Sequence, residues 1–228
     1  MPRAKRQSPG GIVYHVLNRA NARQTIFQGF AEYEAFEKIL AEGLVKIPMR
    51  LTGYCLMSNH WHLLLWPYHD GDLSTFMHWI TMTHTQRWHA VHQTIGTGHL
   101  YQGRFKSFPI QNEPYYLTAL RYIESNPFRA GLVKNSSHWM WSSLAVRRGL
   151  VKNGVVISPG PVELPDRWNE LVDILPGEND LKKIKRSLHR GTPLGRDDWA
   201  KLIAERLLLT STLQPRGRPK KTHPQKGS

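Results

Sequence analysis

The hydrophobic positions of this chain change period from one stretch to the next. Short apolar runs rich in β-branched and aromatic residues are typical of strands. Such runs lie at 12–19, 50–57, 60–66 and 99–111. Elsewhere hydrophobic residues recur every three or four positions, as on one side of a helix. This pattern predicts helices over 31–45, 73–92 and about 112–126. The mixture indicates strands interleaved with helices, although periodicity alone does not determine the topology.

The strand expected at 60–66 separates two kinds of side chain. Successive residues of a strand point to opposite faces, so Trp61, Leu63 and Leu65 share a face suited to a core. His60 and His62 share the other face, about 7 Å apart along the strand. Two neutral imidazoles at this spacing can chelate one divalent cation. The alternative is a structural pair that caps a sheet face.

The helix expected at 112–126 carries a second set of polar groups. Pro127 disfavours helical geometry in the residue before it, so the helix should end near Asn126. Tyr115, Tyr122 and Asn126 fall on one side of it. A phenol and an amide oxygen therefore lie one turn apart at the helix end. Opposite the histidine strand, they would complete a site with two nitrogen ligands, one oxygen ligand and a hydroxyl nucleophile.

The net charge of the chain indicates a class of binding partner. The 228 residues carry a formal net charge of +14, which suits a polyanion such as nucleic acid, although a merely soluble basic protein is the alternative. The single cysteine, Cys55, excludes an internal disulfide and is consistent with a reducing cytoplasm. No apolar stretch reaches the roughly 18 residues that a membrane-spanning helix needs, so no membrane association is expected.

Two further groups of side chains have open interpretations. In the strand expected at 99–111, Arg104 and Lys106 share a face and Phe105 lies on the other, an interleaving that suits single-stranded nucleic acid. A half-buried edge strand explains it equally well. The helix at 73–92 contains several histidines without a nearby carboxylate or cysteine partner, and we favour solvated or core-edge roles over a metal site. They are His78, His84, His89 and His92.

The composition shifts after about residue 146. Helices are predicted at 178–190, with a basic side, and at 196–209, separated by a glycine-containing turn. They permit a helix-turn-helix or an ordinary helical hairpin. In the tail, Arg216-Gly217-Arg218-Pro219 resembles an AT-hook, a segment that binds a narrow minor groove. A disordered basic tail is the alternative.

Two motifs in this order and separation resemble a known family. His60-Trp61-His62 resembles the His-hydrophobe-His motif of the HUH nuclease superfamily. The segment from Tyr122 through Asn126-Pro127 to Val133 resembles the catalytic-tyrosine block of its single-strand transposases, above all the REP-associated tyrosine transposases. Further similarity lies in Pro9-Gly10, Tyr14-His15-Val16, Asn18-Arg19 and 139–143. The likeness covers roughly residues 8–145. We therefore expect a transposase domain at 8–145, a helical accessory region with a candidate role in DNA binding at 146–209, and a basic tail at 210–228.

The resemblance implies an α+β fold, an antiparallel sheet flanked by helices of the ferredoxin-like HUH type, followed by a small basic helical region. It implies that Tyr122 is the nucleophile and that His60, His62 and Asn126 hold a divalent metal, Mg²⁺ or Mn²⁺. Relatives often carry Gln in place of Asn126, and Glu124 is a lower-ranked alternative ligand. We expect DNA contacts from a set of cations, namely Arg104, Lys106, Arg121, Arg129, Arg216 and Arg218.

The implied activity is cleavage and rejoining of single-stranded DNA near REP-like hairpins through a 5′-phosphotyrosine intermediate. The expected location is cytoplasmic and nucleoid-associated, and both a monomer and a homodimer are open. The first alternative is a domesticated, non-catalytic protein that binds DNA hairpins, but it would have no need of Tyr122. The second is a metal hydrolase that uses water in place of tyrosine.

Overall fold

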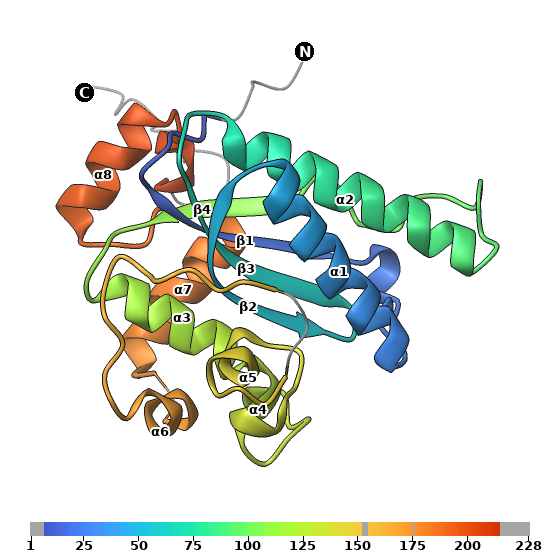
Figure 1. The fold of residues 1–228 in the computed structure, drawn as a ribbon. Coiled ribbons are helices and arrows are strands. Elements are labelled where there is room, and N and C mark those ends of the chain that lie inside the picture. The colour runs from blue at the N-terminus through green and yellow to red at the C-terminus, as the bar shows by residue number, and fades with distance from the viewer. Residues whose placement is uncertain (1–6, 152–154, 175, 215–228) are drawn as a thin grey trace, which may run out of the picture.

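A four-stranded antiparallel sheet forms the middle layer of the protein (Figure 1). The computed structural model describes residues 7–151, 155–174 and 176–214. The strands lie in the order β2-β3-β1-β4. Their bounds are β1 Val13–Arg19, β2 Met49–Met57, β3 His60–Pro67 and β4 Lys106–Ile110. Each strand is short and apolar, and the two-residue turn at 58–59 joins β2 and β3 into a hairpin.

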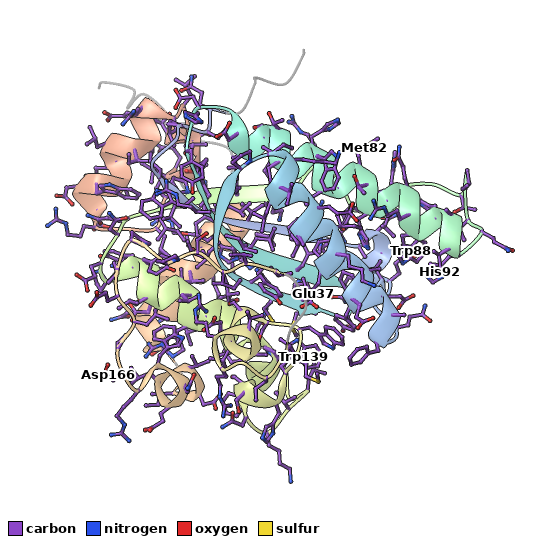
Figure 2. The ribbon with its side chains drawn as sticks, in the orientation of Figure 1. Glu37, Met82, Trp88, His92, Trp139 and Asp166 are labelled. Atoms are coloured by element: carbon purple, nitrogen blue, oxygen red, sulfur yellow. The ribbon has the colours of Figure 1, made fainter. Side chains whose placement is uncertain are left out.

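Two long helices cover one face of this sheet. They are α1, Phe30–Lys46, and α2, Asp72–Val91 (Figure 1). The order β1-α1-β2-β3-α2-β4 with both helices on one face is the ferredoxin-like arrangement. Trp61, Leu63 and Leu65 of β3 point into the core beneath these helices, as their alternation predicts. Within this layer the buried Glu37 of α1 accepts a hydrogen bond of 2.6 Å from the Tyr54 hydroxyl of β2 (Figure 2).

Shorter helices cover the opposite face (Figure 1). The helix α3, Tyr115–Glu124, packs on β2, β3 and β4, while α6, Trp168–Asp173, packs on α3, and α7, Glu178–Arg190, packs on β4. The remaining elements are α4 Asn126–Arg129, α5 Ser143–Arg147 and α8 Asp197–Arg206, with 3₁₀ turns at Asn21–Arg23, Ser136–His138 and Thr210–Thr212. A second hydrophobic core lies here, built around Phe108, Leu120 and Ile184.

The expected α+β fold is confirmed, and two element boundaries differ from the sequence prediction. The strand predicted at 99–111 is regular only over Lys106–Ile110. The prediction is wrong for 99–105, where Tyr101 makes a single bridge to Ala20 and the chain then turns through Gly103. The helix predicted to begin near Asn112 begins at Tyr115. It ends at Glu124, and α4 starts at Asn126 with Pro127 in its first turn.

The C-terminal region packs against the sheet instead of forming a detached unit. The predicted helix at 178–190 is present as α7, and that at 196–209 is present over Asp197–Arg206 as α8. Between them Leu194 exchanges backbone hydrogen bonds with Pro109 and Gln111 at 2.9 and 2.8 Å, so the linker borders β4. The AT-hook-like Arg216 and Arg218 lie outside the described residues. Within the described ranges, no helix has the length and apolar character needed to cross a membrane.

Candidate active site

The predicted site residues lie around one cavity on the α3 face of the sheet. Its volume is about 580 Å³, and we call it the Tyr122 cavity. Strands β1, β3 and β4, the 102–104 loop, and helices α3, α4 and α7 all contribute to its wall. Six of the residues predicted from the sequence line it: His60, His62, Arg104, Lys106, Tyr122 and Asn126. The cavity therefore brings together two segments that are about sixty positions apart in the chain.

Hydrogen bonds hold both histidine rings by their Nδ1 atoms. His60 Nδ1 lies 2.6 Å from Asn59 Oδ1, and the Asn59 amide nitrogen donates to the Arg23 carbonyl at 3.2 Å. This second bond identifies Oδ1 as the acceptor, so His60 carries its proton on Nδ1 and its Nε2 lone pair remains for a ligand. His62 Nδ1 lies 2.8 Å from Nε2 of the fully buried His15. His62 can therefore also use its Nε2 atom as a ligand.

Burial keeps these imidazoles neutral. It lowers the pKa of His60 to about 4, with a smaller contribution from the nearby Arg19 guanidinium. Burial is also the main cause that holds the pKa of His62 well below the ordinary value, and His15 and His60 add to it. A neutral imidazole has the free lone pair that metal ligation requires. The chemistry of the pair therefore suits a divalent metal.

Tyr122 lies beside the histidines, and only 8% of it is exposed. Its ring centroid is 6.5 Å from that of His62, and the Arg129 guanidinium lies 3.8 Å from the centre of the Tyr122 ring. Arg129 also donates to the Tyr122 carbonyl at 2.9 Å and to Asn126 Oδ1 at 3.2 Å. Through these contacts Arg129 holds the Tyr122 ring and the Asn126 amide in place. Arg129 was predicted to contact DNA, but it does not line the cavity.

The oxygen groups near Tyr122 differ in what they can ligate. Asn126 reaches the cavity because it opens α4, directly after the backbone leaves α3 at Ser125. An amide oxygen has two lone pairs, so Asn126 Oδ1 can accept from Arg129 and still ligate a metal. Glu124, the lower-ranked alternative, is fully buried and binds Arg147, Ser143 and Trp168 instead. Its carboxylate joins α3 to α5 and α6.

The metal-binding potential of the site depends on that amide. Among the described residues, no group of three or more His, Cys, Asp or Glu side chains could hold a metal ion. No α2 histidine therefore belongs to a cluster of this kind among the described residues. His84 lies in the core, where its ring contacts Phe27 and Phe36. The residues of the Tyr122 cavity fit a divalent cation as a set of two imidazoles and one amide oxygen, with positions left for water or phosphate.

Four cations surround the cavity, and the described residues of its wall include no carboxylate. Arg104 and Lys106, which are both predicted to contact DNA, are exposed. Arg19 at the end of β1 and Lys185 of α7 also line it. Arg121, the remaining described cation from the prediction, does not line the cavity.

Several site residues were not predicted from the sequence. Strand alternation could have placed Arg19 on the face of His60, because the two residues are paired across β1 and β3. His15 and Asn59 form hydrogen bonds with ring nitrogens of His62 and His60. Only the three-dimensional structure reveals those contacts. Lys185 and His189 of α7 also line the cavity. The basic side of this helix was evident, but its docking against β4 was not.

Comparison with known proteins identifies the family. A family model described as "Transposase IS200 like" matches residues 10–126, about half of the chain, including both histidines, Tyr122 and Asn126. The chain is 26% identical over 147 residues to the REP-associated tyrosine transposase of Escherichia coli (strain K12), a match that covers 62% of this chain and 82% of that protein. The fold of the present chain is similar to that of a solved REP-associated tyrosine transposase bound to a REP hairpin. That similarity has a TM-score of 0.53 at 24% identity and covers 72% of this chain and 95% of the other. The chain belongs to the IS200-like transposase family.

Proposed function

We propose that this protein is a metal-dependent transposase that cuts and rejoins single-stranded DNA through a covalent 5′-phosphotyrosine at Tyr122. The observation that carries the proposal is the convergence of Tyr122, His60 and His62 with Asn126 in one cation-lined cavity. A protein that only bound DNA would need the cations but neither the phenol nor the two ordered imidazoles. The proposed DNA is a short hairpin with an adjoining single strand, because a relative of similar fold was solved with a REP hairpin.

The chemistry assigned to Tyr122 is an in-line displacement at phosphorus. Its phenolic oxygen forms a bond to the phosphorus, the bond from phosphorus to the 3′ oxygen breaks, and the leaving 3′ oxygen gains a proton as the phenol loses one. The products are a 5′-phosphotyrosine and a free 3′-hydroxyl. Attack by a 3′-hydroxyl on the phosphotyrosine reverses the step, so rejoining needs no external energy source.

The remaining residues position these groups and neutralise charge. Arg129 holds the Tyr122 ring and the Asn126 amide, while Asn59 and His15 orient the histidines. A divalent cation held by His60, His62 and Asn126 would place positive charge next to the non-bridging phosphate oxygens. The cations of the cavity wall add to that charge without a competing carboxylate among its described residues. They are Arg19, Arg104, Lys106 and Lys185.

A denaturing gel tests this proposal. The protein is incubated with labelled single-stranded DNA from hairpins flanking its own gene, with Mg²⁺ or Mn²⁺. We expect a slowly migrating protein–DNA adduct that is lost with a chelator and in Tyr122→Phe. Tyr115→Phe is the matched control, because Tyr115 lies on the same helix but outside the cavity wall, and this variant should form the adduct.

Two results would contradict the proposal. Tight binding of the hairpin without adduct or cleavage would make the protein a non-catalytic DNA-binding protein. Cleavage that survives Tyr122→Phe would show that Tyr122 is not the nucleophile, and a metal-bound water would become the leading candidate. The folded state of each variant is checked by circular dichroism, so that loss of structure is not mistaken for loss of chemistry.

A further inference from the structure

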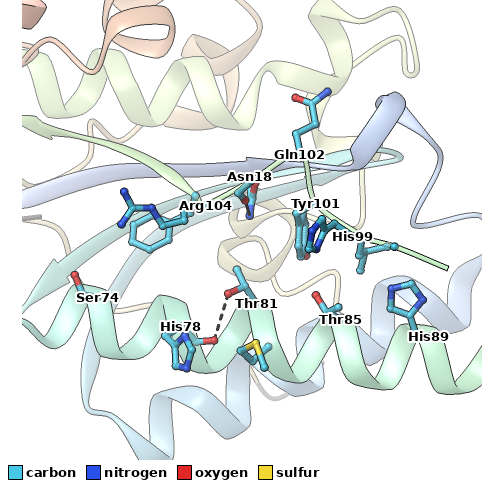
Figure 3. Close-up of a pocket in the computed structure, with 15 residues that line it drawn as sticks. Asn18, Ser74, His78, Thr81, Thr85, His89, His99, Tyr101, Gln102 and Arg104 are labelled. Atoms are coloured by element: carbon cyan, nitrogen blue, oxygen red, sulfur yellow. Dashed lines mark hydrogen bonds between the residues drawn. The ribbon is translucent and has the colours of Figure 1, made fainter. Parts of the chain in front are cut away.

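A second cavity adjoins the Tyr122 cavity. Its volume is about 720 Å³, and it lies between helix α2 and the chain segment 98–105 (Figure 3). We call it the α2 groove. The two cavities share one stretch of wall, formed by Asn18, Gln102, Gly103 and Arg104. Gln102, Gly103 and Arg104 are exposed, so a chain molecule bound at Tyr122 would reach the groove by passing over this loop.

One side of α2 supplies the far wall of this groove. Its residues recur every three or four positions, so they form a row along the helix, as Figure 3 shows. The row consists of Ser74, His78, Thr81, Met82, Thr85 and His89. The Thr81 hydroxyl donates to the Met77 carbonyl at 2.7 Å, which leaves its lone pairs to accept from a ligand. Asn18, Tyr101 and Arg104 lie across from this row (Figure 3).

The charge of the groove suits an anionic ligand. Its described wall contains no aspartate or glutamate, and the same is true of the Tyr122 cavity. Two other cavities of the protein differ in this respect. One includes Glu42 in its wall, and the other includes Asp197. The described walls of both adjoining cavities thus lack a carboxylate that would repel the phosphates of a nucleic acid.

The two cavities differ in the groups they offer. The Tyr122 cavity presents four cations, which suit a phosphate. The α2 groove presents hydroxyl, amide and imidazole groups together with Met82, and Arg104 is its only arginine or lysine among the described residues. A duplex-binding surface needs many cations to meet two phosphate backbones. Neutral hydrogen-bonding groups beside apolar surface suit unpaired bases instead.

We propose that the α2 groove binds the unpaired nucleotides that adjoin the phosphodiester cut at Tyr122, and that it reads their bases. The inference rests on the proposed function for the position of the cut. Arg104, at the junction, contacts the phosphate between the two cavities. The side chains of the α2 row meet base edges and sugars, and Met82, which is 46% exposed, contacts a base face. The groove thereby contributes to the choice of the strand and site that are cut.

Charge substitutions at one groove residue test this assignment. Thr85 lines the groove, whereas its neighbour Gln86 is exposed on α2 outside the groove wall. Binding is measured by fluorescence anisotropy with single-stranded DNA, and Tyr122→Phe is the background so that no strand is cut. A carboxylate in the groove is repelled by the phosphates of the strand whose bases it holds, so Thr85→Glu should weaken binding about tenfold. The control Gln86→Glu adds the same charge and should weaken it less than about twofold.

The sign of the charge and the length of the DNA sharpen the test. Thr85→Lys should bind at least as tightly as the unmodified protein. With a hairpin whose unpaired strand ends at the cut, Thr85→Glu and Gln86→Glu should bind alike, because the groove is then empty. Equal effects of Thr85→Glu and Gln86→Glu on long DNA, or an effect of Thr85→Glu that does not depend on length, would overturn the inference.

The same variants separate this inference from the proposed function. Adduct formation by Gln86→Glu, a substitution outside both cavity walls, is measured with the Tyr122 phenol intact and DNA at saturating concentration. The adduct should still form, since the phenol and the histidines are unchanged. An adduct without length-dependent binding would refute the groove assignment alone. Length-dependent binding without an adduct in the unmodified protein would refute the chemistry alone.

Discussion

The two faces of the sheet differ in what strand β3 presents to them. On the α1/α2 face, Trp61 of β3 is fully buried in a core with Phe36 and Phe76. On the α3 face, His60 and His62 of β3 line the Tyr122 cavity, beside the core around Phe108 and Leu120. Successive residues of β3 take part in both, so the same strand supplies packing on one side and chemistry on the other.

Buried polar groups on the two faces are also satisfied differently. On the α1/α2 face, Trp61 Nε1 donates to the Tyr101 hydroxyl at 2.9 Å, and Tyr101 donates to His84 Nδ1 at 2.5 Å. This series of hydrogen bonds ends within the core. On the α3 face, Nδ1 of His60 and of His62 is hydrogen-bonded while Nε2 is left for a ligand. The site therefore consists of half-satisfied polar groups on an otherwise ordinary sheet.

The largest effect that would sharpen this comparison is expected from Trp61→Ala. Trp61 is fully buried, so truncation leaves a cavity and removes one hydrogen-bond donor from the Tyr101 hydroxyl, and should lower the free energy of unfolding by about 3–5 kcal/mol. The neighbouring His60→Ala, whose side chain lines an open cavity, should lower it by less than about 1 kcal/mol. Urea denaturation measures both. Equal losses would contradict the functional division between the faces.

A smaller effect concerns the pH dependence of stability through His84. Burial lowers the pKa of His84 to about 3 from an ordinary value of 6.5. Between these values the unfolded state binds the proton and the folded state does not, so the stabilisation is complete above pH 6.5 and is lost as the pH falls towards 3. Between pH 7 and pH 5, the native protein should lose about 2 kcal/mol more of unfolding free energy than His84→Gln. Parallel pH profiles would refute this assignment.

The smallest effect is expected on the α3 face, from His15→Phe. Phenylalanine keeps the ring that packs on Phe108, with centroids 4.9 Å apart in the native pair, but cannot hydrogen-bond to His62 Nδ1. Loss of the hydrogen bond to His62 should weaken Mn²⁺ binding about tenfold, as titration followed by electron paramagnetic resonance would measure. Phe108→Leu is the control, because it alters the packing but retains the hydrogen bond. Unchanged Mn²⁺ affinity in His15→Phe would show that His15 does not orient His62.

Much of this architecture could be predicted from the pattern of apolar residues. The alternation along 60–66 correctly assigns Trp61 to a core and His60 to the opposite face. The motif around Tyr122 indicates the family. The error at 99–105 has a local cause: the sequence there has strand composition, but the turn at Gly103 limits it to one bridge with Ala20. Composition cannot reveal where hydrogen bonding stops.

Other features of the site depend on contacts between segments far apart in the chain. The hydrogen bond of His15 to His62 joins diagonal positions on β1 and β3, so it requires the strand order and register. Lys185 reaches the cavity only because the linker after α7 pairs with β4 through Leu194. Periodicity describes one element at a time and carries no information about how such elements dock.

The position of a nucleotide remnant on the protein tests the central claim most directly. The covalent adduct is digested with nuclease and trypsin, and mass spectrometry locates the modified residue. The account predicts a phosphonucleotide on Tyr122, which faces His62 in the cavity. A remnant on Tyr115 or Tyr116, or on a residue outside the cavity, would contradict the assignment of the nucleophile.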